Sequence, residues 1–186
     1  PPQPIVERYE AATDMLAELH RKTLPETAPV APRASYQIPV YEIDAWLVEI
    51  GLMLEWYLPD RGAEVSQQQR DEFAAMWRTL LEKPAAAPRT WVMRDFHSPN
   101  IIWLGERTGI LRVGIIDFQD AVLGPAAYDL VSLLQDARRD VSPQLEAKAL
   151  SHYFSLRPDV DASSFMDDYT ALAALNQSRI SIVTLP

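Results

Sequence analysis

The chain has 186 residues, with 17 Lys and Arg against 26 Asp and Glu, so its formal net charge is -9. This acidic balance, without a Lys/Arg cluster, argues against a nucleic-acid or anionic-membrane surface and favours small-molecule partners. The absence of cysteine excludes disulfides and thiolate chemistry. Together with the lack of a long apolar run, it leads us to expect a cytoplasmic protein with no membrane contact.

The first half of the chain is patterned as helices and loops. Apolar residues recur at helical spacing from Val6 onward, and this helix should end before Pro25. A loop rich in proline is predicted over 24–33. A strongly apolar helix is predicted over 43–57, because its hydrophobic residues extend well around the cylinder.

A capping box marks the start of the next helix, since Ser66 is followed three residues later by Gln69. This helix is predicted to end at Lys83. The segment 84–88, which reads PAAAP, should then be a connector.

The C-terminal part is also patterned mostly as helices. Gly124 and Pro125 indicate a turn, and Ser142 followed by Pro143 is typical of a helix N-terminus. The predicted helices are Tyr128 to Ala137, Ser142 to Phe154 and Ser163 to Gln177. The tail 179–186 alternates as a strand does, although this signal is weak.

A β-hairpin is predicted in the middle of the chain. Its two apolar strands run from Asn100 to Leu104 and from Ile110 to Ile116, on either side of a turn-rich segment at 105–109. The chain therefore has an α+β pattern, mostly helical with one hairpin that carries the functional groups.

Three polar residues gather at the open end of this hairpin. Asp95 and Asn100 precede the first strand and Asp117 ends the second, so antiparallel pairing should bring Asn100 and Asp117 together. Asp and Asn are common in turns, but a carboxylate that ends a buried strand is costly unless it meets a cation or several donors. An oxygen-ligand pair of this kind suits Mg²⁺ and phosphoryl transfer, with Asp95 orienting the attacking hydroxyl.

The motifs here carry a resemblance to a known family. The stretches RDFHSPN, GIIDFQDAVLGPAAYDLVSLLQDARRDV and EWYL resemble the aminoglycoside phosphotransferase and protein-kinase-like superfamily. They are most similar to its anomeric kinases for N-acetylmuramate and N-acetylglucosamine in cell-wall recycling. The resemblance implies a kinase-like fold that uses ATP, or less often GTP, with Mg²⁺. It also implies that Asp95 is the catalytic base, that Asn100 and Asp117 bind Mg²⁺, and that Asp129 supports the catalytic loop.

Other residues are weaker candidates for the site. Asp129 could instead be the N-cap of its helix, and Arg94 is assigned to support of the catalytic loop. Three residues could contact substrate or phosphate: His97, Asp120 and Trp56. Each also has a bland interpretation, because a single loop histidine is often a scaffold and an aromatic residue at helical spacing is often core.

An absence shapes the interpretation of the whole chain. We find no Gly-rich loop, strand lysine or partnering helix glutamate of the kind that kinase-like enzymes carry in an N-terminal nucleotide lobe. We therefore interpret 1–186 as the C-terminal lobe alone, an incomplete part of a sugar kinase. The alternatives are an aminoglycoside or choline-type kinase, or a non-catalytic kinase-like module, against which the intact Asp95, Asn100 and Asp117 argue.

Overall fold

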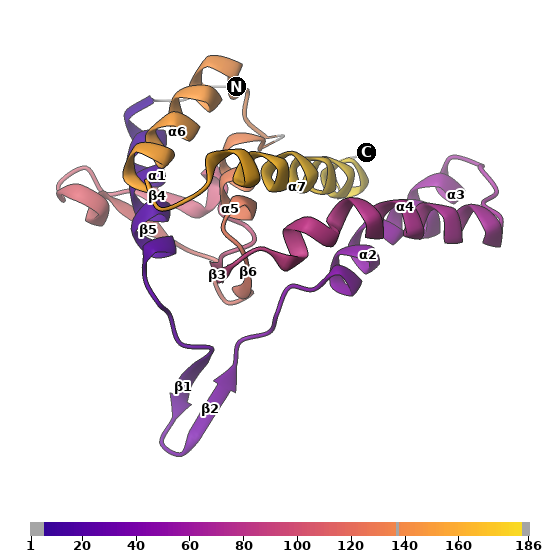
Figure 1. The fold of residues 1–186 in the computed structure, drawn as a ribbon, viewed down its shortest axis with the longest axis horizontal. Helices are drawn as coiled ribbons and strands as arrows, with labels where there is room; N and C mark the ends of the chain where they lie inside the picture. The colour runs from indigo at the N-terminus through magenta and orange to yellow at the C-terminus, as the bar shows by residue number, and fades with distance from the viewer. Residues whose placement is uncertain (1–5, 137, 184–186) are drawn as a thin grey trace.

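The computed structural model describes residues 6–136 and 138–183, which form a mostly helical α+β arrangement (Figure 1). Its α-helices are α1 (Val6–Arg21), α2 (Ile43–Leu52), α3 (Leu58–Asp60), α4 (Gln67–Ala86), α5 (Ala127–Leu134), α6 (Pro143–Leu156) and α7 (Ala162–Val183). Its strands are β1 (Thr27–Ala31), β2 (Ala34–Gln37), β3 (Arg89–Val92), β4 (Ile101–Trp103), β5 (Val113–Ile115) and β6 (Val122–Pro125). No helix among these is long and apolar enough to cross a membrane.

Helix α5 lies near the centre of the body and is buried along its whole length, and α7 and α1 pack against it (Figure 1). On one side α7 packs against α5 and α4, and on the other α1 packs against α6. Two predicted helix starts are confirmed. Ser66 and Gln69 form the reciprocal capping box of α4, and the Ser142 hydroxyl accepts the backbone N–H of Leu145 at the start of α6.

The apolar helix predicted over 43–57 is present but not uniform. It consists of α2 followed by a π-helix, η1 (Met53–Tyr57), and the short α3 continues it. Trp46 and Ile50 are fully buried, whereas Val48 and Trp56 are exposed. The helix is therefore buried on one side only, whereas a helix of this composition is expected to be deeply buried or to line a groove.

The loop predicted over 24–33 is wrong in part, because 27–31 form β1, which pairs with β2 in an antiparallel hairpin. Its ladder pairs Thr27 with Gln37 and is interrupted between Pro29 and Ala31. The hairpin can include Pro29 because each of its two strands has only one neighbour. A proline, which lacks an N–H, is tolerated where that position faces the unpaired edge of a strand. The hairpin projects away from the helices (Figure 1), and nearly all its residues are exposed.

The turn predicted at Gly124 and Pro125 is also wrong, because both residues belong to β6, which pairs with β3. Gly124 is needed for close packing. A Cβ at this position would lie 3.3 Å from the Val92 Cγ2 and 3.5 Å from the Tyr41 Cβ. The glycine therefore lets β3 and the chain around Tyr41 approach β6 from two sides.

Three helix ends differ from the predicted ones. The helix α4 continues past Lys83 through the buried Pro84 to Ala86, so the connector predicted at 84–88 is mostly helical. The helix α5 ends at Leu134, and Ala137 lies outside the described residues. Residues 179–183 continue α7 instead of forming a strand, since Ile180 and Val183 also fit helical spacing; the rest of the tail, 184–186, lies outside the described residues.

Candidate active site

The hairpin β4–β5 brings together two of the predicted site residues. The ladder pairs Ile101 with Ile115, and the Ile116 N–H donates to the Asn100 carbonyl at 3.1 Å. As a result, the Asn100 Nδ2 lies 3.5 Å from the Asp117 Oδ2. The hairpin is confirmed, with strands shorter than predicted and a 3₁₀ turn, η3 (Gly109–Arg112), before β5.

The loop that carries Asp95 is held to the same pair through its backbone. The Asp95 carbonyl accepts a bond from the Asn100 Nδ2 at 3.0 Å and one from the His97 N–H at 2.9 Å. The next residue, Phe96, is fully buried and anchors the loop in the core. The 3₁₀ turn η2 (Ser98–Asn100) then leads into β4.

Asp129 is not a helix cap, since Ala126 occupies that position in α5. Its buried carboxylate instead accepts the backbone N–H of Met93 at 2.8 Å and that of Arg94 at 3.1 Å. Burial raises the pKa of Asp129 to about 7, although the two N–H donors act in the opposite direction. Asp129 therefore holds the backbone at the start of the loop that carries Asp95.

Several contacts hold Arg94 in an unusual backbone conformation. Its φ of 63° lies in the left-handed region, which non-glycine residues seldom adopt. The Ser132 hydroxyl donates to its carbonyl at 2.9 Å, and its guanidinium binds the Glu49 carboxylate at 2.7 Å and lies over the Tyr41 ring. These contacts compensate for the strain, as is common beside functional groups.

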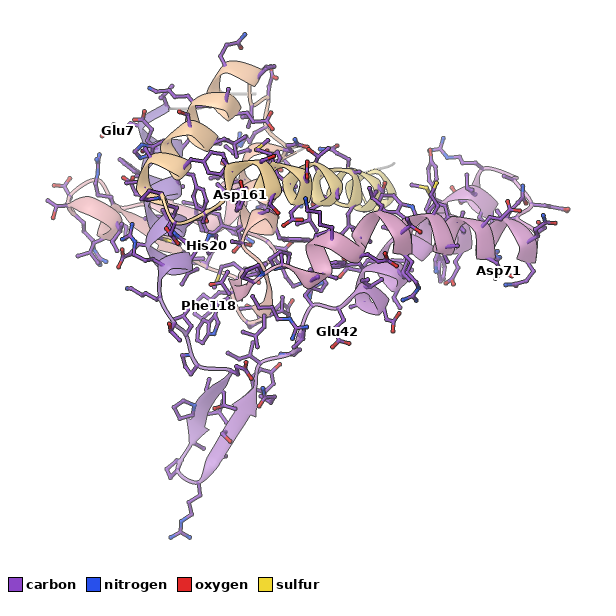
Figure 2. The ribbon with its side chains drawn as sticks, in the orientation of Figure 1. Glu7, His20, Glu42, Asp71, Phe118 and Asp161 are labelled. Carbon is purple, nitrogen blue, oxygen red and sulfur yellow. The ribbon has the colours of Figure 1, made fainter. Side chains whose placement is uncertain are left out.

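Asp117 also has a left-handed backbone, with a φ of 60°. Its Oδ1 accepts a hydrogen bond from the Gln119 Nε2 at 2.6 Å. The strand before it is less buried than predicted, because only Val113 is buried and Ile116 is exposed. Ile116 and Phe118 are therefore exposed apolar side chains on either side of Asp117 in the sequence, and Figure 2 labels Phe118.

The donor set fits a magnesium ion shared with a phosphate group. The described residues contain no cluster of three His, Asp or Glu side chains able to hold a metal. The pair offers a carboxylate oxygen of Asp117 and the Oδ1 of Asn100, whose Nδ2 is engaged with the Asp95 carbonyl. Mg²⁺ commonly takes one or two protein oxygens and completes its shell with water and phosphate oxygens.

The weaker candidates lie at different places. His97 is half-buried, and its Nδ1 is buried without a hydrogen-bond partner in the part of the chain that the structure describes. Burial and the charge of Arg138 lower the pKa of His97, so its ring is neutral at neutral pH. Asp120 is exposed in the turn between β5 and β6. Trp56 is 70% exposed on the π-helix, and it takes no part in the contacts described above for the Asp95 loop.

Sequence reasoning did not predict that three residues support the loop, namely Tyr41, Glu49 and Ser132. Ser132 left a readable signal, because it and Asp129 are the polar residues in an otherwise apolar helix and lie three positions apart on one face. Tyr41 and Glu49 left none, since both lie far from Arg94 in sequence. The Tyr41 hydroxyl donates to the Glu49 carboxylate at 2.8 Å.

A base candidate and an oxygen-ligand pair, carried by a loop and a hairpin against a helical body, define a phosphotransferase-type site. The chain belongs to the phosphotransferase enzyme family, whose model matches residues 1–173. It is 38% identical over 172 residues to an N-acetylmuramate/N-acetylglucosamine kinase of Caulobacter vibrioides, covering 92% of this chain and 47% of that protein.

Two further relatives carry the same name. The protein from Neisseria meningitidis is 41% identical over 101 residues, which cover 54% of this chain and 29% of the relative. The protein from Pseudomonas putida is 32% identical over 133 residues, which cover 69% of this chain and 34% of the relative. The chain thus spans about half the length, or less, of the curated relatives that it matches.

Proposed function

We propose that the whole protein is an ATP- and Mg²⁺-dependent kinase that phosphorylates the anomeric hydroxyl of an amino sugar, N-acetylmuramate or N-acetylglucosamine, in cytoplasmic cell-wall recycling. The observation that carries this proposal is the meeting of Asn100 and Asp117 at 3.5 Å, with the Asp95 backbone bonded to the same Asn100 side chain. A structural turn would not require all three groups.

In this reaction the sugar hydroxyl oxygen attacks the γ-phosphorus of the nucleotide, and the bond to the bridging oxygen breaks. Asp95 orients the hydroxyl and accepts its proton, and Asn100 and Asp117 would hold a magnesium ion. A bound Mg²⁺ supplies charge neutralisation across the phosphate oxygens. The chain itself contributes mainly positioning, because its fixed loop holds the base close to the metal ligands.

We assign residues 1–186 to the C-terminal lobe of a kinase-like fold. The apolar side chains of Ile102, Ile116 and Phe118 are exposed beside Asn100 and Asp117, where a second lobe and the nucleotide base would cover them. Apolar groups clustered in this way commonly mark a surface that is covered in the complete protein. On this assignment the chain alone holds metal and acceptor but binds ATP poorly.

The acceptor assignment rests on the three relatives, which carry the same name and align with this chain over 172, 101 and 133 residues. The half-buried His97 is one residue of the site that could meet the sugar, since its Nδ1 has no partner among the described residues. Its neutral ring could donate to or accept from a hydroxyl group.

The experiment is a turnover assay on the full-length protein with ATP or GTP, with and without Mg²⁺. Acceptors are N-acetylmuramate, N-acetylglucosamine, an aminoglycoside and choline. We expect metal-dependent nucleotide consumption with the two N-acetyl sugars and a product whose reducing end is blocked. Turnover confined to the aminoglycoside or choline would contradict the acceptor assignment, and no turnover with any acceptor would favour a binding module.

A further inference from the structure

A cavity lies at the end of the β3–β6 sheet that is farther from the Asp95 loop. Its volume is about 430 Å³, and it is lined by the end of α1, the segments 87–90 and 125–127, and the chain from the end of α6 into α7. Strand β3 leads from Thr90 in the cavity wall toward Met93, which binds Asp129. At about 3.3 Å per residue, β3 separates the two places by roughly 10 Å or more.

Three residues of the wall carry buried polar atoms without a hydrogen-bond partner in the described part of the chain. These atoms are the His20 Nε2, the Asp168 Oδ1 and the Thr90 Oγ1. His20 and Asp168 are each only 7% exposed. Leaving such a group unsatisfied is destabilising, so their gathering around one cavity indicates a bound partner there.

His20 offers the cavity an uncharged hydrogen-bonding group. Its Nδ1 forms a hydrogen bond with the Tyr153 hydroxyl at 2.9 Å, and Nε2 is the ring nitrogen that has no partner among the described residues. Burial and the nearby charge of Arg157 lower the pKa of His20 to about 3, so the ring is neutral at neutral pH. Figure 2 shows His20, at the end of α1, near Asp161, which also lines the cavity.

The charges of the wall favour a cation. The Arg157 guanidinium is matched by Asp159, whose carboxylate it binds at 2.7 Å. The remaining charged groups of the lining are two carboxylates, Asp161 and Asp168, and one guanidinium, Arg89. The balance is therefore acidic, and the buried carboxylate is Asp168.

An apolar surface lies beside this carboxylate. Asp161 immediately precedes α7, and Phe165 and Asp168 follow it at intervals of four and three, so the three residues lie along one side of this helix. The Phe165 ring packs on Tyr153 with centroids 5.3 Å apart, and both line the cavity. A ligand that matches this wall has an apolar body with a positive group at one end.

We propose that this cavity is a second small-molecule site, which binds an organic amine with its ammonium group at Asp168 and its apolar body against Phe165. The site does not depend on the function proposed above. Its volume lies within the range of ordinary ligand pockets.

The test measures benzylamine binding to the full-length protein by titration calorimetry. We expect one saturable site, at least tenfold weaker binding by the neutral isostere benzyl alcohol, and at least a tenfold loss of benzylamine affinity in Asp168→Asn. The matched control is Asp167→Asn, because Asp167 is the neighbouring residue, is exposed, and pairs with Lys83. Its affinity should stay within twofold of wild type.

A second readout needs no variant. Burial raises the pKa of Asp168, and a bound ammonium should lower it again, which carbon NMR of the side-chain carboxyl would show on saturation with benzylamine. Absence of saturable binding would mean that the cavity holds only water and would overturn the proposal. Equal losses in both variants, or an unchanged Asp168 pKa, would do the same.

Discussion

Arg94 and Glu49 lie 45 positions apart, and their ion pair, at 2.7 Å, joins the catalytic loop to α2. Both side chains are mostly covered, with 27% and 19% of their surface exposed. Tyr41 completes the arrangement by bonding Glu49 and lying beneath the guanidinium. Any shift of α2 would therefore act on the residue next to Asp95.

The first prediction concerns this ion pair. Glu49→Gln should lower the free energy of unfolding by about 1–3 kcal/mol, because it leaves a covered guanidinium without its carboxylate. It should also lower kcat by about tenfold or more, since Asp95 loses part of its positioning. Urea unfolding and a turnover assay on the full-length protein measure the two effects.

Asp44→Asn is the matched control for Glu49→Gln. Asp44 lies on the same helix and pairs with Arg78, but both side chains are more than half exposed. An exposed pair contributes little, so stability and turnover should remain near wild type. If both variants behave alike, the Glu49–Arg94 pair has no special role in the site.

The second prediction concerns Asp95. Asp95→Asn should reduce turnover by about 10²- to 10⁴-fold, because an amide cannot accept the hydroxyl proton. The substitution leaves unchanged the Asp95 backbone carbonyl, which accepts the bonds from Asn100 and His97. Steady-state kinetics of the full-length protein test this, and near-normal turnover would exclude Asp95 as the base.

The third prediction concerns Asp117, and asparagine is the informative substitute. Asn tolerates the left-handed φ of 60° found here, so Asp117→Asn removes the charge without adding backbone strain. The Mg²⁺ concentration for half-maximal rate should rise at least about tenfold, since the metal loses its carboxylate ligand. A magnesium titration of the rate measures this, and an unchanged midpoint would remove Asp117 from the metal site.

The fourth prediction concerns the pH dependence of stability. The Asp129 pKa is near 3.8 in the unfolded chain and about 7 in the folded one. Between these values the folded protein keeps a proton that the unfolded chain has lost, so this group destabilises the fold as pH rises from about 4 to 7. The stability advantage of wild type over Asp129→Asn should therefore shrink by roughly 3–4 kcal/mol across this window.

Urea unfolding at intervals from pH 4.5 to 8 measures this difference. Ser132→Ala is the control, because it removes the other α5 bond to Arg94 without removing a titrating group. Its stability loss should be the same at every pH. A constant difference between wild type and Asp129→Asn would instead show that Asp129 titrates in its ordinary range.

The sequence was most informative where the determining contacts are local. The β4–β5 pairing joins residues about 14 positions apart, so its apolar runs and turn residues were enough to predict that Asn100 and Asp117 meet. The capping signals at Ser66 and Ser142 were equally local. The hairpin spacing also indicated a metal-binding role for Asn100 and Asp117, whereas the residues alone left Asp129 between a helix cap and support of the Asp95 loop.

Long-range contacts explain what the sequence could not predict. The four-residue strands β3 and β6 pair across about thirty positions and are too short to show a pattern. The left-handed backbones at Arg94 and Asp117 occur without glycine, because tertiary contacts compensate for their strain. The β1–β2 hairpin was missed because its prolines resemble those of a loop.

The β1–β2 hairpin is a suitable place to attach a label or a fusion partner. Its strands contribute almost no buried surface, and its tip at Arg33 already has a left-handed φ of 71°. A cysteine for a fluorescent dye, an affinity tag or a crystallisation partner inserted at this tip would leave the packed helices and the Asp95 loop untouched. Since the native chain contains no cysteine, such a label would attach at one chosen position of this chain.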